Sequence, residues 1–102
     1  MTNCNVLECS IYGLTKTLGK KYAVFILIEL NKNDCRFSDF EKFFDYLSNV
    51  QLSRSLKLLK DEGLINKRDE IYTLSEYGEE VARVILELEL VSEKYEQIKM
   101  ND

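Results

Sequence analysis

The chain has 102 residues, of which 14 are lysine or arginine and 18 are aspartate or glutamate, so its formal net charge is −4. That length is typical of one domain, and a hydrophobic content of 45% excludes an intrinsically disordered chain. The longest apolar run, residues 22–28, is too short to cross a bilayer, and no secretion signal is recognisable at the start. We therefore expect a single cytoplasmic domain.

Three cysteines and no histidine limit the chemistry of the chain. Cys4, Cys9 and Cys35 form no closely spaced pair, and a structural zinc site usually needs four cysteine or histidine ligands. Disulfide scaffolding is not expected in a cytosolic chain. Because the sequence also lacks a phosphate-binding glycine loop and a nucleophile elbow, we expect no metal, no cofactor and no enzymatic activity.

The first third of the chain is predicted to contain two helices. Residues 1–8 are expected to form a loose arm, and residues 9–18 a first helix. The apolar residues expected on one face of that helix are Ile11, Leu14 and Leu18. Residues 20–30 are apolar nearly all round, which suits a buried helix or a buried strand, and the moderate β-branched content favours a central helix. Residues 31–35 are expected to form a polar loop.

The third helix is predicted to open on a capping box. Ser38 and Glu41 have the spacing at which a hydroxyl accepts from a backbone N–H while the acidic side chain reaches back. The core side of this helix is expected to consist of Phe37, Phe40, Phe43, Phe44 and Leu47.

The fourth helix, at about residues 49–62, has strong start and stop signals. Ser48 and Gln51 form a capping box, and Gly63 suits a left-handed C-terminal cap because it has no Cβ. The inner face at helical spacing consists of Leu52, Leu56 and Leu59. The opposite face, polar and partly basic, consists of Val50, Ser53, Arg54, Lys57 and Asp61.

A hairpin and a long helix are predicted to complete the chain. Residues 64–67 and 71–74 are expected to be strands joined by a polar turn at residues 68–70. Ser75 is the predicted N-cap of the last helix.

Two short helices followed by a hairpin are the layout of a winged helix-turn-helix, which commonly places its second helix in a DNA groove. We expect a mainly α fold with a small β-hairpin, a DNA-binding core over residues 9–74 and a long C-terminal dimerisation helix over residues 75–102. The residues expected to contact DNA are Asn49, Val50, Gln51, Ser53, Arg54 and Lys57 in the helix and Lys67 and Arg68 beside the wing turn. Among them, Asn49 and Gln51 suit adenine, and Arg54 suits guanine.

The last helix carries an apolar seam. Its members step by 4, 3, 4, 3, 4 and 3 residues, which is the a/d spacing of a helix–helix interface. They are Tyr77, Val81, Val84, Leu88, Val91, Tyr95 and Ile98. Ile85, Leu86 and Leu90 widen the apolar surface beyond what one helix can bury on its own domain. We therefore expect a homodimer, the alternative being a single helix packed along its own domain.

Charge is unevenly distributed along the chain. Residues 50–68 contain five basic and two acidic side chains, whereas residues 75–102 contain eight acidic and three basic ones. The local field governs approach to a phosphate backbone, so the fourth helix and the wing remain compatible with double-stranded DNA. The acidic net charge keeps a second interpretation open, a winged-helix protein-interaction module or adapter that binds no DNA.

Four segments carry a family resemblance: CSIYGLTKTLGKKYAVFILIEL, RFSDF, LSRSLKLLKDEGLI and YTLSEYG, with Cys9 ten residues before Gly19. With these segments the chain resembles the HxlR-type winged-helix regulators, prokaryotic transcription factors related to MarR-like and archaeal winged-helix regulators. The family usually has tryptophan where Tyr22 stands, glycine where Lys20 stands, and a longer wing. The resemblance implies a dimer whose terminal helices form the interface and whose helix-turn-helix reads DNA.

Cys9 supports a third interpretation, a thiol-based redox-sensing repressor. Some members of the resembling family use a cysteine at the matching position as an oxidant sensor, and a sensor thiol needs thiolate character and solvent access. Glu8 opposes the thiolate, and free cysteine is commonly a small buried hydrophobe. The sequence identifies no small-molecule effector, no operator and no direction of regulation.

Overall fold

The computed structural model describes the backbone of residues 6–20 and 22–100 and the side chains of residues 11–20 and 22–98. The elements in chain order are α1 (Val6–Leu18), α2 (Ala23–Lys32), β1 (Cys35–Arg36), α3 (Phe37–Phe43), α4 (Asn49–Asp61), β2 (Ile65–Arg68), β3 (Ile71–Leu74) and α5 (Glu76–Met100). The predicted mainly α fold with a β-hairpin and a long last helix is confirmed. α1 begins at Val6, inside the segment predicted to be a loose arm.

α2 is the buried central helix that the sequence predicts. Its inward side chains have exposed fractions of 4% or less and are Ala23, Ile26, Leu27 and Leu30. The helix continues to Lys32, so the polar loop before β1 is shorter than predicted. α2 therefore provides the surface against which the later elements pack.

The start of α3 differs from the prediction. The helix begins at Phe37, and the carboxylate of Asp39 accepts a hydrogen bond from the backbone N–H of Arg36 at 2.8 Å. The predicted capping box of Ser38 and Glu41 is therefore wrong, because both residues lie inside the helix. A capping carboxylate must stand three residues after the N-cap, and Asp39 has that spacing from Arg36.

A third strand, which the sequence analysis did not predict, completes the sheet. β1 and β2 both pair antiparallel with β3, so the strand order is β1-β3-β2. Cys35 lies opposite Tyr72, and Arg36 lies opposite Ile71. Because α3 follows β1 directly, this pairing attaches the start of α3 to the wing.

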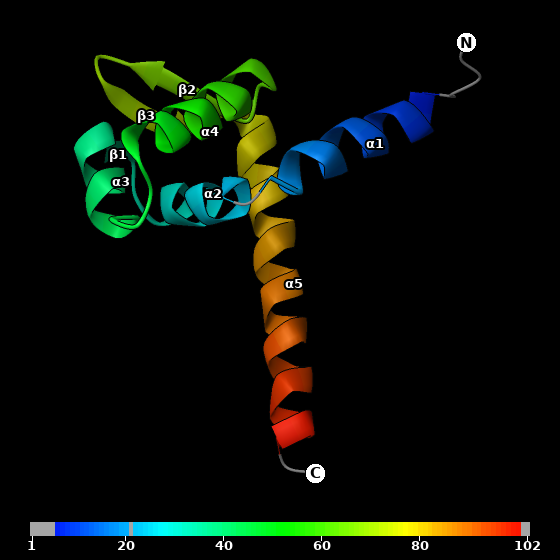
Figure 1. Cartoon of the computed structure of the whole chain (residues 1–102). Coiled ribbons are helices and arrows are strands. Elements are labelled where there is room, and N and C mark those ends of the chain that lie inside the picture. Colours follow the sequence, from blue (N-terminus) through cyan, green and yellow to red (C-terminus); the bar gives the residue numbers. More distant parts are fainter. Residues whose placement is uncertain (1–5, 21, 101–102) are drawn as a thin grey trace.

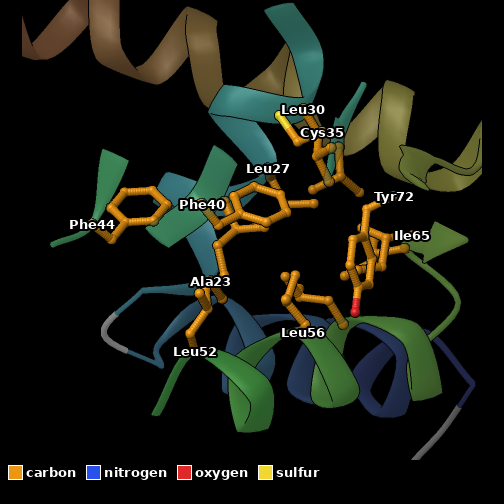
Figure 2. Packing of buried hydrophobic residues seen from close by; sticks show 14 of the residues in the cluster. Ala23, Leu27, Leu30, Cys35, Phe40, Phe44, Leu52, Leu56, Ile65 and Tyr72 are labelled. Carbon is orange, nitrogen blue, oxygen red and sulfur yellow. The ribbon is translucent and has the colours of Figure 1, made fainter. Parts of the chain in front are cut away.

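The core forms where α2, α3, α4 and the sheet meet (Figure 2). Phe40 is fully buried, and its ring centroid lies 5.9 Å from that of Tyr72 and 6.4 Å from that of Phe44. The predicted core residue Phe43 is instead 50% exposed. The reason is that α3 ends at Phe43, and the turn after it directs Phe44 and Leu47 inward.

Two helices leave the compact head that α2, α3, α4 and the sheet form (Figure 1). The distal part of α5 stands clear of the head as a rod, and α1 extends outward from the start of α2. Large apolar side chains on both helices are exposed, among them Ile11, Tyr12, Leu88, Leu90 and Val91. None of the helices that the structure describes has the length and apolar character needed to cross a membrane.

Candidate nucleic-acid interface

The start of α4 is held by the predicted capping box. The hydroxyl of Ser48 accepts from the backbone N–H of Gln51 at 3.1 Å, and Oε1 of Gln51 accepts from the backbone N–H of Ser48, also at 3.1 Å. This reciprocal pair satisfies two N–H groups that have no partner within the helix. It also engages the oxygen that Gln51 would use in a bidentate contact with adenine.

The end of α4 is a Schellman motif. Gly63 has a φ of 81°, its N–H donates to the carbonyl of Lys60 at 3.0 Å, and the N–H of Leu64 donates to the carbonyl of Leu59 at 2.9 Å. The predicted left-handed cap at Gly63 is confirmed. Fixed at both ends, α4 is a short rigid helix with a defined outer face.

That outer face carries the residues that the sequence analysis selected. Leu52, Leu56 and Leu59 are buried, so the helix turns its other side to solvent. The predicted contact residues on that side are all exposed and are Asn49, Val50, Gln51, Ser53, Arg54 and Lys57. Lys57 is engaged by its neighbour one turn later, since its Nζ donates to Asp61 at 3.0 Å.

The wing is shorter and more tightly turned than predicted. β2 extends through Arg68, and the connection to β3 consists of Asp69 and Glu70 alone, with φ values of 52° and 68°. Two successive left-handed residues are typical of a type I′ hairpin turn. Arg68 is therefore a strand residue on an edge strand, and its side chain is exposed.

Lys67 is the most constrained of the predicted cationic contacts. Its Nζ lies 5.5 Å from the centroid of the Tyr72 ring and 3.7 Å from Oε2 of Glu70. Cation–π contacts and ion pairs of this kind restrict a lysine that would otherwise sample many rotamers. These contacts hold Lys67 against the wing, where it also lines a cleft that α4 borders.

One basic residue of α4, Lys60, was not among the predicted contacts. Lys60 lines the cleft between α4 and the wing together with Lys57 and Lys67, and this α4–wing cleft has a volume of about 430 Å³. Lys60 also lines a second groove, together with Ile65 and Asn66 of β2. The sequence places Lys60 in the basic segment, but only the packing of the hairpin against α4 brings it to the cleft.

The predicted dimer seam divides into two groups in the structure. Val81 is 8% exposed and belongs to the core of its own domain, so its assignment to an exposed seam is corrected. It is buried because the first turns of α5 pack on the head. The other six members have exposed fractions of 45% to 63% and are Tyr77, Val84, Leu88, Val91, Tyr95 and Ile98.

A shallow apolar groove adjoins the seam. It has a volume of about 300 Å³, and α1 contributes Leu14 and Leu18 to it while α5 contributes Val84 and Leu88. Partly exposed apolar side chains from both outer helices thus form one continuous surface. Such surfaces on small proteins commonly mark interaction sites.

Among the three cysteines, the structure describes the side chain of Cys35 alone. Cys35 is 4% exposed, and its thiol donates to the carbonyl of Asn33 at 3.3 Å. Burial, with smaller contributions from nearby carboxylates, raises the pKa of Cys35 to about 11. Cys35 is therefore an unreactive thiol at neutral pH. The side chain of Cys9, the predicted redox residue, lies outside the described residues.

Comparisons with known proteins point to one family. The model of the HxlR-like helix-turn-helix family matches residues 17–100. No curated protein matches the chain. Among solved structures, a possible HxlR family transcriptional factor from Thermoplasma volcanium is 28% identical over 82% of each chain, with a TM-score of 0.72.

Two further solved structures share the fold at lower identity. Quinone-bound YodB from B. subtilis is 23% identical over 83% of this chain and 96% of that chain, with a TM-score of 0.77. The redox regulator HypR in its reduced form is 15% identical over 91% of this chain and 99% of that chain, with a TM-score of 0.78.

Proposed function

Because the chain belongs to the HxlR-like helix-turn-helix family, we propose that it is a sequence-specific DNA-binding transcription regulator that acts as a homodimer. The observation that carries this proposal is the outer face of α4. It is rigidly capped at both ends and presents amide, hydroxyl and guanidinium groups to solvent. These are the groups that pair with base edges in the major groove.

The roles of the individual residues follow from their positions. Asn49 and Arg54, on the outer face of α4, are the best placed to choose a sequence, with Val50 available to a thymine methyl group. Ser53 and Lys57 suit phosphates or base edges. Arg68, on the exposed edge strand of the wing, suits the DNA backbone.

Two copies are proposed to join along the exposed apolar surface of α5 and α1. A symmetric pair presents two α4 helices to one side of a duplex, and such pairs read half-sites about 34 Å apart. The six exposed seam residues on α5 support this arrangement, because an isolated domain gains nothing from leaving them in water.

Selection of bound duplexes from random DNA, followed by fluorescence anisotropy over a salt series, tests the proposal. We expect a pseudo-palindromic selected sequence, and affinity that falls linearly in a log–log plot as salt rises, because bound phosphates release counterions. If the chain binds no duplex at low ionic strength, the DNA-binding proposal is wrong and the alternative of a protein-interaction adapter replaces it.

A second candidate function, redox control of that regulator through Cys9, is favoured by the structural similarity to the redox regulator HypR. Mild peroxide treatment followed by intact-mass analysis and a gel shift would test it, with Cys9→Ser as the control. We expect oxidation at Cys9 to change DNA affinity. Unchanged affinity of a chain shown to be oxidised at Cys9 would rule out sensing.

A further inference from the structure

In the α4–wing cleft, two of the three lysines form ion pairs with carboxylates. Lys57 donates to Oδ2 of Asp61 at 3.0 Å, and Nζ of Lys67 lies 3.7 Å from Oε2 of Glu70. All four side chains line the cleft. Lys60 lines it too, and its ammonium group forms no ion pair with any residue that the structure describes. Base reading by Asn49 and Arg54 does not use the two carboxylates or Lys60.

We propose that a backbone phosphate of the bound duplex seats in the α4–wing cleft, where it displaces Asp61 and Glu70 from Lys57 and Lys67 and gains Lys60 as a third contact. This inference rests on the proposed DNA-binding function. It adds a phosphate site and an internal competitor for that site.

The diameter of a helix relative to the width of the major groove indicates where the phosphate would lie. An α-helix with its side chains is about 10–12 Å across and the major groove is about 12 Å wide, so a helix in the groove has a phosphate strand along each flank. Lys60 lies on the flank of α4 that faces the wing, because it lines both the cleft and the groove against Ile65. The strand on that flank passes between α4 and the wing.

The competing carboxylates are held in place by the fold. Asp61 is the last residue of α4, one turn after Lys57, and Glu70 is fixed in a left-handed conformation at the tight turn of the wing. Carboxylate and phosphate oxygens accept the same charge-assisted hydrogen bond from an ammonium group. In the free protein, Asp61 and Glu70 therefore stand in for phosphate oxygens.

The competition is weak enough for DNA to overcome. Three of the four paired side chains have exposed fractions of 60% or more, and only Lys67, at 35%, is partly covered. Exposed ion pairs contribute little to stability, so a phosphate can replace them at small cost. Every duplex meets this cost, so the carboxylates lower the affinity for selected and random DNA alike.

Anisotropy titrations of the full chain with a selected duplex and a scrambled duplex test the competitors. Asp61→Asn and Glu70→Gln each remove one carboxylate, and we expect each to raise affinity for both duplexes by about two- to fivefold. Glu79→Gln, on α5, makes the same change in net charge away from the cleft and is the matched control. Screening by salt should keep its effect below about twofold.

A methylphosphonate scan of the selected duplex tests the phosphate itself. Neutralising one phosphate at a time should weaken binding of the unmodified chain by about three- to tenfold at one position in each half-site. Lys60→Ala should weaken binding to the unmodified duplex. A methylphosphonate at the sensitive position should then weaken its binding little further, because the substitution and the methylphosphonate remove the same contact. Lys32→Ala, at the end of α2, is the matched lysine control.

The outcomes separate the two proposals. If the unmodified chain binds neither duplex, the DNA-binding function fails and the cleft proposal fails with it. Two results would overturn the cleft proposal alone, provided that the unmodified chain binds the selected duplex. One is that Asp61→Asn and Glu70→Gln leave the affinities for both duplexes unchanged. The other is that Lys60→Ala loses as much affinity as the unmodified chain at every methylphosphonate position.

Discussion

The hydroxyl of Ser75 donates a hydrogen bond to the carbonyl of Gly63 at 2.6 Å, across twelve residues of chain. The same hydroxyl oxygen accepts from the N–H of Gly78 at 3.0 Å, and the N–H of Ser75 donates to the carbonyl of Leu64 at 3.0 Å. The predicted N-cap at Ser75 is confirmed, and it does more than begin α5. It attaches the start of α5 to the C-terminal cap of α4.

Gly78→Ala should destabilise this junction. A Cβ at Gly78 would overlap the carbonyl oxygen of Leu64 and lie 3.2 Å from Cδ2 of Leu74. We expect the free energy of unfolding to fall by about 1–3 kcal/mol, because backbone must move to admit the methyl group. Urea unfolding at one fixed protein concentration measures the change.

Gly13→Ala is the matched control for that measurement. A Cβ at Gly13, within α1, meets nothing within 4 Å. Alanine in a helix interior is favoured over glycine, so we expect this variant to be more stable by about 0.5–1 kcal/mol. Equal destabilisation of both variants would mean that close approach to Leu64 is not the cause.

Arg54→Ala should weaken binding to the selected duplex. If Arg54 reads a guanine, the loss should be about 1–3 kcal/mol and should be accompanied by relaxed preference at that base pair. Anisotropy titrations with the selected duplex and with single-base variants of it measure both effects. Arg83→Ala, on α5, removes the same charge from an exposed arginine and should leave base preference unchanged. An unaltered isotherm for Arg54→Ala removes Arg54 from the reading set.

Leu88→Glu should convert the proposed homodimer to a monomer. Leu88 is 63% exposed at the middle of the seam, so a glutamate there would place one charge from each copy in an apolar interface. Size-exclusion chromatography with light scattering gives the number of copies. Leu90→Glu is the control, because Leu90 is equally exposed, at 65%, but lies off the a/d positions. Dissociation by Leu90→Glu alone would place the interface on the other stripe of α5.

The stability contributed by Cys35 should be lost in alkaline solution. Because folding raises the pKa of Cys35 from 9.0 to about 11, the native state holds this proton more tightly than the unfolded state. The contribution is complete below pH 9 and declines as pH rises from 9 toward 11. Unfolding measurements across this range should show a shallower decline for Cys35→Ala than for the unmodified chain, and parallel curves would contradict the assignment.

Alkylation gives an independent check on the same thiol. Cys35 in the folded chain should react slowly with iodoacetamide at neutral pH, because only the thiolate is nucleophilic and the side chain is buried. Peptide mapping after timed labelling identifies which cysteine reacts. Rapid labelling of Cys35 at neutral pH in a folded chain would show that the thiol is more accessible than the structure has it.

The parts of the fold that could be predicted are those with local signals. The caps of α4 depend on residues within one turn of its ends, so Ser48, Gln51 and Gly63 are sufficient to predict them. The leucine stripe of α4 likewise needs only helical periodicity. For this reason the residues on the outer face of α4 were identified correctly as exposed.

The parts that could not be predicted depend on contacts between distant segments. β1 has only two residues, and it forms because Cys35 and Arg36 pair with Tyr72 and Ile71 on β3. Likewise, the seven-residue spacing of apolar residues in α5 does not predict that Val81 is buried against its own domain. The position of Lys60 beside the cleft could not be predicted for the same reason, since the wing has to fold against α4 before a cleft exists.

α5 is one uninterrupted helix of 25 residues that runs from the junction with α4 to the end of the seam. In a pair joined along that seam, the axial offset of the two rods sets the separation of the two reading heads. A slip of one heptad would change the axial separation of the two heads by about 10 Å, which is about three base-pair steps. In the proposed dimer, α5 would therefore set the spacing of the operator's half-sites without contacting a base. Insertions or deletions of whole heptads in α5 should select operators of altered spacing.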